Sequence, residues 1–260
     1  MIKTIKGWNN HTLVKAVQLA AFFITIPALV VLVVNFTWFY LCVMLLSVVM
    51  IAKVGHSIGQ HRYFCHRSFQ TTRAKEWLIG VCATLCTSHT PIYYSAVHRY
   101  HHATSDTEAD PHSPSQIGMT RGFLGLIDET KAKNIPARII RDLVGNPVVM
   151  FFHNWYWPTI VAYLTLLVMI DPMLVLFCYV IPVGYTKFIT GSQISLGHGK
   201  GYRNFDTRDA SVNNIFINYL TLGEGLHNNH HARASEFDFG YTRKPYEWDF
   251  CGTLVRWFFL

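Results

Sequence analysis

Four long apolar runs constrain the fold of this 260-residue chain more than any other feature of its sequence. They cover residues 12–34, 38–54, 148–170 and 173–195. Each approaches the roughly 20 residues that a helix needs to cross about 30 Å of hydrocarbon. Only 14% of the residues are charged, which is well below the quarter that is usual in soluble domains. The sequence therefore predicts an all-α integral membrane protein.

The connections between the runs predict its topology. The links near Asn35 and Asp171 are short and carry no Lys or Arg, so the four runs should pair as two hairpins. Lys and Arg gather in the N-terminus and in the segments 55–147 and 196–260, which by the positive-inside rule are cytoplasmic. We expect four transmembrane helices in two hairpins, both termini in the cytoplasm, and a cytoplasmic helical cap. The whole chain, residues 1–260, should form a single domain.

Histidines gather in three short windows that lie beside the apolar runs. The windows are His61-Arg-Tyr-Phe-Cys-His66, His98-Arg-Tyr-His101-His102 and His227-Asn-Asn-His230-His231, and they hold eight of the fourteen histidines. Imidazole is the commonest nitrogen ligand of transition metals. Eight imidazoles are too many for one ion and sufficient for two. The sequence thus predicts a dimetal site just outside the bilayer.

The spacing within the windows indicates how such ligands could be shared. His98, His101 and His102 stand at i, i+3 and i+4, which places them on one face of a helix. That face can offer two ligands to one metal and one to its neighbour, and the third window repeats the spacing. His61 and His66 are five apart and would share a face only roughly. Imidazole alone leaves zinc, copper and iron open, and a redox pair of irons suits an open, nitrogen-rich site that binds oxygen.

The remaining segments and residues carry weaker expectations. Residues 77–97 are apolar, but a fifth crossing there would separate the first two histidine windows, so we expect a helix in the membrane interface. The net charge of +7 is spread between apolar runs, which favours an anionic lipid surface or an anionic substrate head group and not nucleic acid. Cys65 should be a buried hydrophobe. His11 and His153 look unrelated to the site, and His56, His89 and His112 lack ligand spacing.

The motifs as a set resemble the membrane-bound fatty acid desaturases, and most closely the acyl-CoA, stearoyl-CoA-like delta-9 type. The resemblance covers about residues 20–255 and adds three segments to the windows above. These are Asp106-Thr-Glu-Ala-Asp110-Pro-His112, His198-Gly-Lys-Gly-Tyr-Arg203 and Gly223-Glu-Gly-Leu-His227. It implies His198 as a ninth ligand. Family members often carry an asparagine four residues before that histidine, where this chain has Ile194 with Gln193 beside it.

The resemblance also implies chemistry and partners. It implies two iron ions, molecular oxygen as co-substrate, and electrons from a separate protein of the ferredoxin, rubredoxin or cytochrome b5 type. The product would be a cis double bond in a saturated fatty acyl chain carried by coenzyme A or by a lipid. A hydroxylase on the same scaffold is the alternative enzyme, and a metal transporter is disfavoured because the runs hold few ionisable residues. The short chain without a cytochrome domain favours a bacterial inner membrane over the endoplasmic reticulum.

Acids and cations near the windows have candidate supporting roles. Metal-bound imidazoles donate their second ring N–H to a carboxylate or carbonyl, and Asp110 and Glu224 are the best placed acids, ahead of Asp106 and Glu108. Gln193 could replace the family's asparagine. The cations that could meet the phosphates of a substrate are Arg62, Arg99 and Arg203.

Overall fold

The computed structural model describes residues 11–260, and within that range the chain is helical without a β-strand. Only the isolated bridges Tyr202–Asn213 and Asn213–Leu226 tie extended segments together. The predicted all-α class is confirmed. The expectation that the N-terminus is cytoplasmic falls on residues 1–10, which lie outside the described residues.

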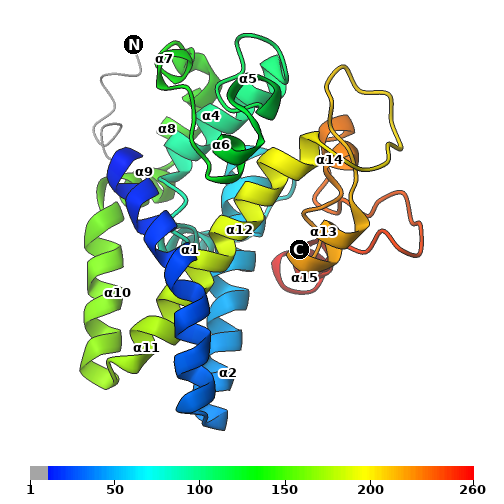
Figure 1. Ribbon diagram of the computed structural model, residues 1–260. Coiled ribbons are helices and arrows are strands. Elements are labelled where there is room, and N and C mark those ends of the chain that lie inside the picture. Colours follow the sequence, from blue (N-terminus) through cyan, green and yellow to red (C-terminus); the bar gives the residue numbers. More distant parts are fainter. Residues whose placement is uncertain (1–10) are drawn as a thin grey trace.

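Between residues 11 and 260, three helices are long and apolar enough to cross a membrane. The first is α1 (His11–Val34). The second runs from Trp38 to Cys65 as α2 (Trp38–Ser47) followed by η3 (Val48–Cys65). The third runs from Met173 to His198 through α11 (Met173–Val175), η5 (Leu176–Val180), α12 (Ile181–Ser195) and η6 (Leu196–His198). Figure 1 shows α1, α2 and α12 packed as a bundle.

The apolar run at 148–170 does not form one long helix as predicted. It divides into α9 (Pro147–Asn154) and α10 (Tyr156–Ile170), with the break at Trp155. Pro158 explains the break, because it has no N–H to donate to the carbonyl of Asn154. The 15 residues of α10 extend only about 22 Å, which is less than the hydrocarbon thickness of about 30 Å.

The two short connections lie at the same end of the bundle. The hydroxyl of Tyr40, near the start of α2, donates a 2.5 Å hydrogen bond to Oδ2 of Asp171, in the turn that follows α10. The histidine-bearing ends of the long helices are at the opposite end. The bundle therefore supports one side of the cap that holds every histidine window (Figure 1).

The cap is made of short helices around the ends of the long ones. Residues 77–97 are not one helix, because the chain turns between α3 (Arg73–Leu85) and α4 (Pro91–Thr104), where Thr87 and His89 have positive φ. Thr90 caps α4, with Pro91 in its first turn. The other elements are α5 (Pro114–Ile117), α6 (Met119–Phe123), α7 (Glu129–Ala132), η4 (Ala137–Ile140), α8 (Arg141–Val144), α13 (Ile215–Thr221), α14 (His227–Ala232), α15 (Phe250–Leu254) and η7 (Val255–Phe259).

Candidate metal centre

The nine histidines that the sequence singles out come together in two groups. Within each group, one ring nitrogen of every member lies within 4.8 Å of the corresponding nitrogens of the others. The larger group is His61, His66, His98, His102 and His230, and the smaller one is His101, His198, His227 and His231. Rings of the two groups touch, since His102 and His231 stack with centroids 4.3 Å apart.

The first window lies on the second long helix and not beyond it. We expected that span to end near residue 54, but the helix continues to Cys65 and carries His61 with it. The N–H of His66 donates to the carbonyl of His61 at 3.1 Å, an i→i+5 bond that winds this end more widely than an α-helix. The wider turn brings two histidines five residues apart into one group. Cys65 is buried and belongs to neither group.

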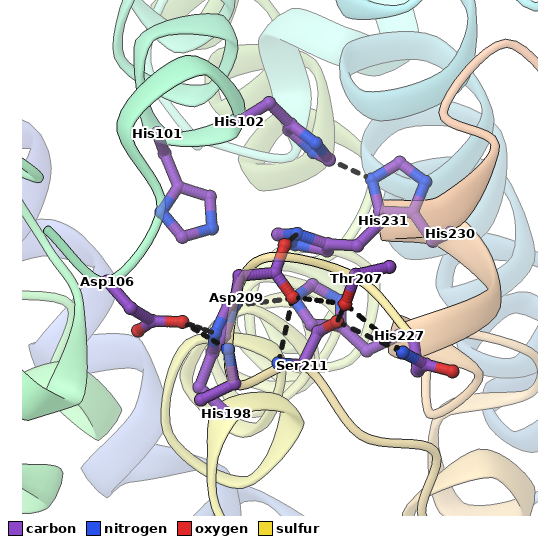
Figure 2. A network of polar contacts seen from close by, with 12 residues as sticks. His101, His102, Asp106, His198, Thr207, Asp209, Ser211, His227, His230 and His231 are labelled. Atoms are coloured by element: carbon purple, nitrogen blue, oxygen red, sulfur yellow. Dashed lines mark hydrogen bonds and ion pairs between the residues drawn. The ribbon is translucent and has the colours of Figure 1, made fainter. Parts of the chain in front are cut away.

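Helices α4 and α14 each divide their histidines between the groups. In α4, His98 and His102 join the larger group and His101 the smaller one. In α14, His227 and His231 join the smaller group and His230 the larger one. Figure 2 shows His101 and His102 of α4 facing the histidines of α14. This is the two-and-one division that the i, i+3, i+4 spacing predicts.

The larger group cannot satisfy itself with hydrogen bonds. Nε2 of His230 lies 3.0 Å from Nε2 of His61 and 2.9 Å from Nε2 of His102. The ring N–H of His61 points to Glu224 through Nδ1, which leaves a lone pair on its Nε2. If Nε2 of His230 donates its one N–H to His61, that nitrogen has no lone pair left to accept from His102, so one proton would have to serve both contacts. A metal about 2.1 Å from each nitrogen would place them about 3 Å apart at right angles, so these residues fit a metal.

Two further ring nitrogens support the same conclusion. Nε2 of His66 and Nε2 of His231 are buried and have no hydrogen-bond partner among residues 11–260. One of these residues belongs to each group. Buried polar atoms without a partner are rare in native proteins unless an ion or water completes them.

The imidazoles are held in the form that binds metal. Burial, together with the repulsion between neighbouring imidazoles, lowers the pKa of the affected rings well below the usual 6.5, so they are neutral at pH 7. The rings outside the spans that behave in this way are His66, His98, His102, His227, His230 and His231. Neutral imidazole supplies the lone pair that a metal needs.

Four carboxylates accept the outward-facing N–H groups of these histidines. Asp110 lies 2.7 Å from Nδ1 of His101, and Glu224 lies 3.1 Å from Nδ1 of His61, as the sequence led us to expect. Asp106, a weaker expectation, lies 2.9 Å from Nδ1 of His198 (Figure 2). Such carboxylates fix the ring orientation and raise the basicity of a ligand.

The fourth carboxylate was missed from the sequence. Asp209 lies 2.7 Å from Nδ1 of His231, but it sits in the loop after His198 and bears no regular spacing to any histidine. Glu108 is exposed and contacts no ring. Gln193 donates to Oε2 of Glu224 at 2.5 Å, so its amide reaches the larger group through Glu224 and His61.

Arg62 does not have the position that the sequence suggested. Its side chain is fully buried and pairs with Glu224 and with Asp249, the latter at 3.0 Å. Nε donates to the carbonyl of Phe237 at 2.8 Å, and the guanidinium lies over the ring of Phe239. With these donors occupied inside the protein, Arg62 is a buried counter-ion of the metal centre and is not placed to meet a substrate phosphate.

Arg99 and Arg203 also bind the protein itself. Arg99 donates to the carbonyls of Phe64 and Cys65 and to Asp142, which ties the end of η3 to α8. Arg203 donates to the carbonyls of Thr207 and Asp209 at 2.8 Å each. In the described structure these guanidinium groups hold segments of the chain that support the histidines.

A cavity of about 90 Å³ adjoins both groups. Its wall includes His98, His101 and His227, together with apolar side chains such as Val97 and Ile127. His11 also lines it, whereas from its position in the sequence we expected this residue to be unrelated to the site. Its Nδ1 lies 2.7 Å from the hydroxyl of Tyr93, and its ring stacks on His89. His112 lines the cavity too and stacks on His101, whereas His153 lines a different pocket.

Comparison with known proteins identifies the family. The family model described as "Fatty acid desaturase" matches residues 36–236, which is most of the chain and includes all nine histidines of the two groups. The chain belongs to the fatty acid desaturase family. This desaturase is 32% identical to the sn-1 stearoyl-lipid 9-desaturase of Anabaena variabilis, over 87% of its own length and 81% of the relative's. It is 30% identical to Delta-9 acyl-lipid desaturase 2 of Arabidopsis thaliana (86% and 73%) and 26% identical to the Delta(9)-fatty-acid desaturase fat-7 of Caenorhabditis elegans (90% and 73%).

Proposed function

We propose that this desaturase introduces a cis double bond at the delta-9 position of a saturated fatty acyl chain carried by a lipid or by coenzyme A. The observation that carries the proposal is the pair of buried histidine groups beside one cavity, in a chain of this family. Two of the relatives reported above are named as a stearoyl-lipid 9-desaturase and a delta-9 acyl-lipid desaturase, whereas the acyl-CoA relatives include a 5-desaturase and a Delta(11) desaturase.

We propose further that the five-histidine group and the four-histidine group each hold one iron ion. Two irons would supply the redox chemistry that uses molecular oxygen and two electrons to remove two hydrogens from adjacent methylenes. The protein's part is to hold nine imidazoles at fixed angles. Glu224, Asp106, Asp110 and Asp209 do this by accepting the Nδ1–H of their partners.

The cavity would position the acyl chain and keep water away. Val97, Ile127 and Ile194 give its wall an apolar surface against which methylenes can pack. His98, His101 and His227 lie in the same wall, so a chain held there would have its methylenes beside both groups. Five of the nine histidines, among them His101 and His227 in the cavity wall, are buried, which would limit the access of bulk water to the reacting carbons.

The membrane arrangement and the partners complete the proposal. We propose that α9 and α10 together make a fourth, broken crossing of the membrane. The hydrogen bond between Tyr40 and Asp171 supports this, because it places the connection before α2 and the connection after α10 at the same end of the bundle. Both termini would then be cytoplasmic, in a single domain over residues 1–260. Electrons would come from a separate protein of the ferredoxin, rubredoxin or cytochrome b5 type, in a bacterial inner membrane.

Analysis of cellular fatty acids tests this function. The chain would be expressed together with a candidate electron donor, total fatty acids would be analysed by gas chromatography–mass spectrometry, and derivatisation would locate any new double bond. We expect a new cis-monoene with the bond at carbon 9, absent from cells that express His98→Ala. A hydroxylated acid in its place would show an oxygenase. No product from an iron-loaded chain that the donor reduces would overturn the proposal.

A further inference from the structure

The segment 196–260, expected in the cytoplasm, carries a surface that is poorly suited to water. Helix α13 exposes Phe216, Tyr219 and Leu220, with 71% of Phe216 accessible. The C-terminal residues Trp257 and Phe258 are likewise exposed. Figure 1 shows α13 and α15 beside the upper part of the helical bundle and not above it. Large apolar side chains gathered in this way mark a contact surface.

Two contacts fix the depth of α13 relative to the long helices. The hydroxyl of Tyr185 donates to the carbonyl of Leu220 at 2.8 Å. Tyr185 follows Met173, where its helix begins, by 12 residues, which is about 18 Å along the helix axis. The hydrocarbon layer is about 30 Å thick. The end of α13 thus contacts the third long helix at a point about 18 Å from the start of that helix, which is less than the thickness of the hydrocarbon layer.

The second contact comes from another helix and gives the same depth. Nζ of Lys53 donates to the carbonyl of Thr221 at 2.5 Å. Lys53 follows Trp38, where its helix begins, by 15 residues, which is at most about 22 Å along the axis. Nζ of Lys53 also lies 5.0 Å from the centroid of the Tyr185 ring. Two spans therefore hold the end of α13 at one level.

The backbone carbonyls at the end of α13 all find hydrogen-bond donors within the protein. The last four carbonyls of a helix have no partner within it. Here Asn218 and Tyr219 accept from the backbone N–H groups of Gly223 and Leu222, at 3.0 and 3.4 Å. Tyr185 and Lys53 serve the other two carbonyls, those of Leu220 and Thr221. Every carbonyl is satisfied by protein, which is the condition for a helix end inside hydrocarbon.

We infer that α13 and the C-terminal residues 257–260 lie within the membrane leaflet nearest the cap, where Phe216, Tyr219 and Leu220 contact lipid acyl chains. The occupant of this surface is lipid, because Tyr185 and Lys53 hold the end of α13 against two spans, at a level that their hydrocarbon-facing side chains also occupy. The metal-bearing cap is then partly sunk into the bilayer and does not rest above it. The inference concerns depth in the membrane and does not depend on the reaction that the centre catalyses.

Spin labels on the full chain in liposomes test this depth. Cys42, the exposed cysteine among the described residues, is first replaced by serine. Phe216→Cys and Trp257→Cys are then labelled with a nitroxide. Accessibility to oxygen, which concentrates in lipid, is compared with accessibility to a water-soluble nickel chelate. Asp206→Cys, on a fully exposed side chain of the cap loop, is the control.

We expect oxygen to relax the labels at 216 and 257 more than the nickel chelate does, and the reverse at 206. Nickel accessibility at 216 equal to that at 206 would place α13 in water and overturn the inference. Low accessibility to both reagents, with spin–spin broadening that grows with protein density, would show a second copy on this surface and overturn it as well. Low accessibility that appears only when an electron-donor protein is added would show that this protein covers the surface, and it would also overturn the inference.

Discussion

The carboxylate of Asp209 lies 2.7 Å from Nδ1 of His231, although 22 residues separate them in the chain. The other oxygen of Asp209 accepts from the N–H of Ser211 at 3.0 Å and from the hydroxyl of Thr207, so the loop holds the carboxylate in place. His231 therefore keeps its proton on Nδ1 and turns Nε2 toward the smaller group (Figure 2). A loop that contributes no member to either histidine group thus positions a histidine on α14.

Replacing Asp209 with asparagine should weaken the metal centre without unfolding it. The amide oxygen of Asp209→Asn can still accept from His231 but carries no charge, and loss of such a partner typically costs about 10–100-fold in metal affinity or activity. Iron content and fatty acid product would be measured together. The control is Asp206→Asn, three residues earlier on an exposed side chain, which should match the wild type. Equal iron and activity in both variants would mean that Asp209 does not support the centre.

Arg62→Ala should reduce stability, not substrate affinity. The substitution leaves Glu224 and Asp249 buried without their counter-ion, which typically costs about 3–5 kcal/mol. Thermal unfolding of the purified protein in detergent would measure the loss. Arg243→Ala, which removes an exposed partner of Asp238, should change stability by less than about 1 kcal/mol. If the variant unfolds at the same temperature as the wild type but has a raised KM, Arg62 would instead be a substrate-binding cation.

His11→Ala should lower activity while bound iron stays constant. The ring lines the cavity and makes a 2.7 Å hydrogen bond to Tyr93, but it belongs to neither histidine group. Loss of a bond worth about 1 kcal/mol predicts a several-fold effect, seen mainly in KM. Leu13→Ala, on an exposed side chain of the same helix, is the matched control. If His11→Ala behaves like that control, the cavity wall near α1 does not hold substrate.

Removing metal should destabilise the protein reversibly. Without an ion, Nε2 of His230 lies about 3 Å from two other ring nitrogens but has only one proton to share between the two contacts. In addition, Nε2 of His66 and Nε2 of His231 remain buried without a hydrogen-bond partner among the described residues. A ligand that binds only the native state stabilises it by mass action. We expect chelation to lower the unfolding temperature by several degrees and ferrous iron to restore it. An identical unfolding temperature in metal-free and iron-loaded protein would contradict a metal role for these residues.

The sequence predicted the parts of the site that follow a regular period. The i, i+3, i+4 spacing in α4 and α14 was enough to predict how each helix divides its histidines, because an α-helix repeats every 3.6 residues. The approach of His66 to His61 depends on a widened turn that spacing does not reveal. Asp209 depends on the path of a loop, for which the sequence holds no periodic signal.

Burial and helix ends were harder to predict. Arg62 looked like a cytoplasmic cation because its charge follows an apolar run, but the helix carries it inward to two acids that lie 162 and 187 residues further along the chain. The apolar run at 148–170 has the composition of a span, and only the missing N–H of Pro158 indicates the break at Trp155. Composition predicts where a chain is apolar, whereas tertiary contacts decide where each helix stops.

The metal content of the purified protein tests the central claim most directly. Inductively coupled plasma mass spectrometry would give iron per chain for the wild type and for His66→Ala and His231→Ala, which remove one member from each group. We predict two irons per wild-type chain, with each variant losing iron mainly from its own group. A wild-type chain that is fully folded and binds one iron, none, or a different metal in stoichiometric amount would contradict the two-iron centre.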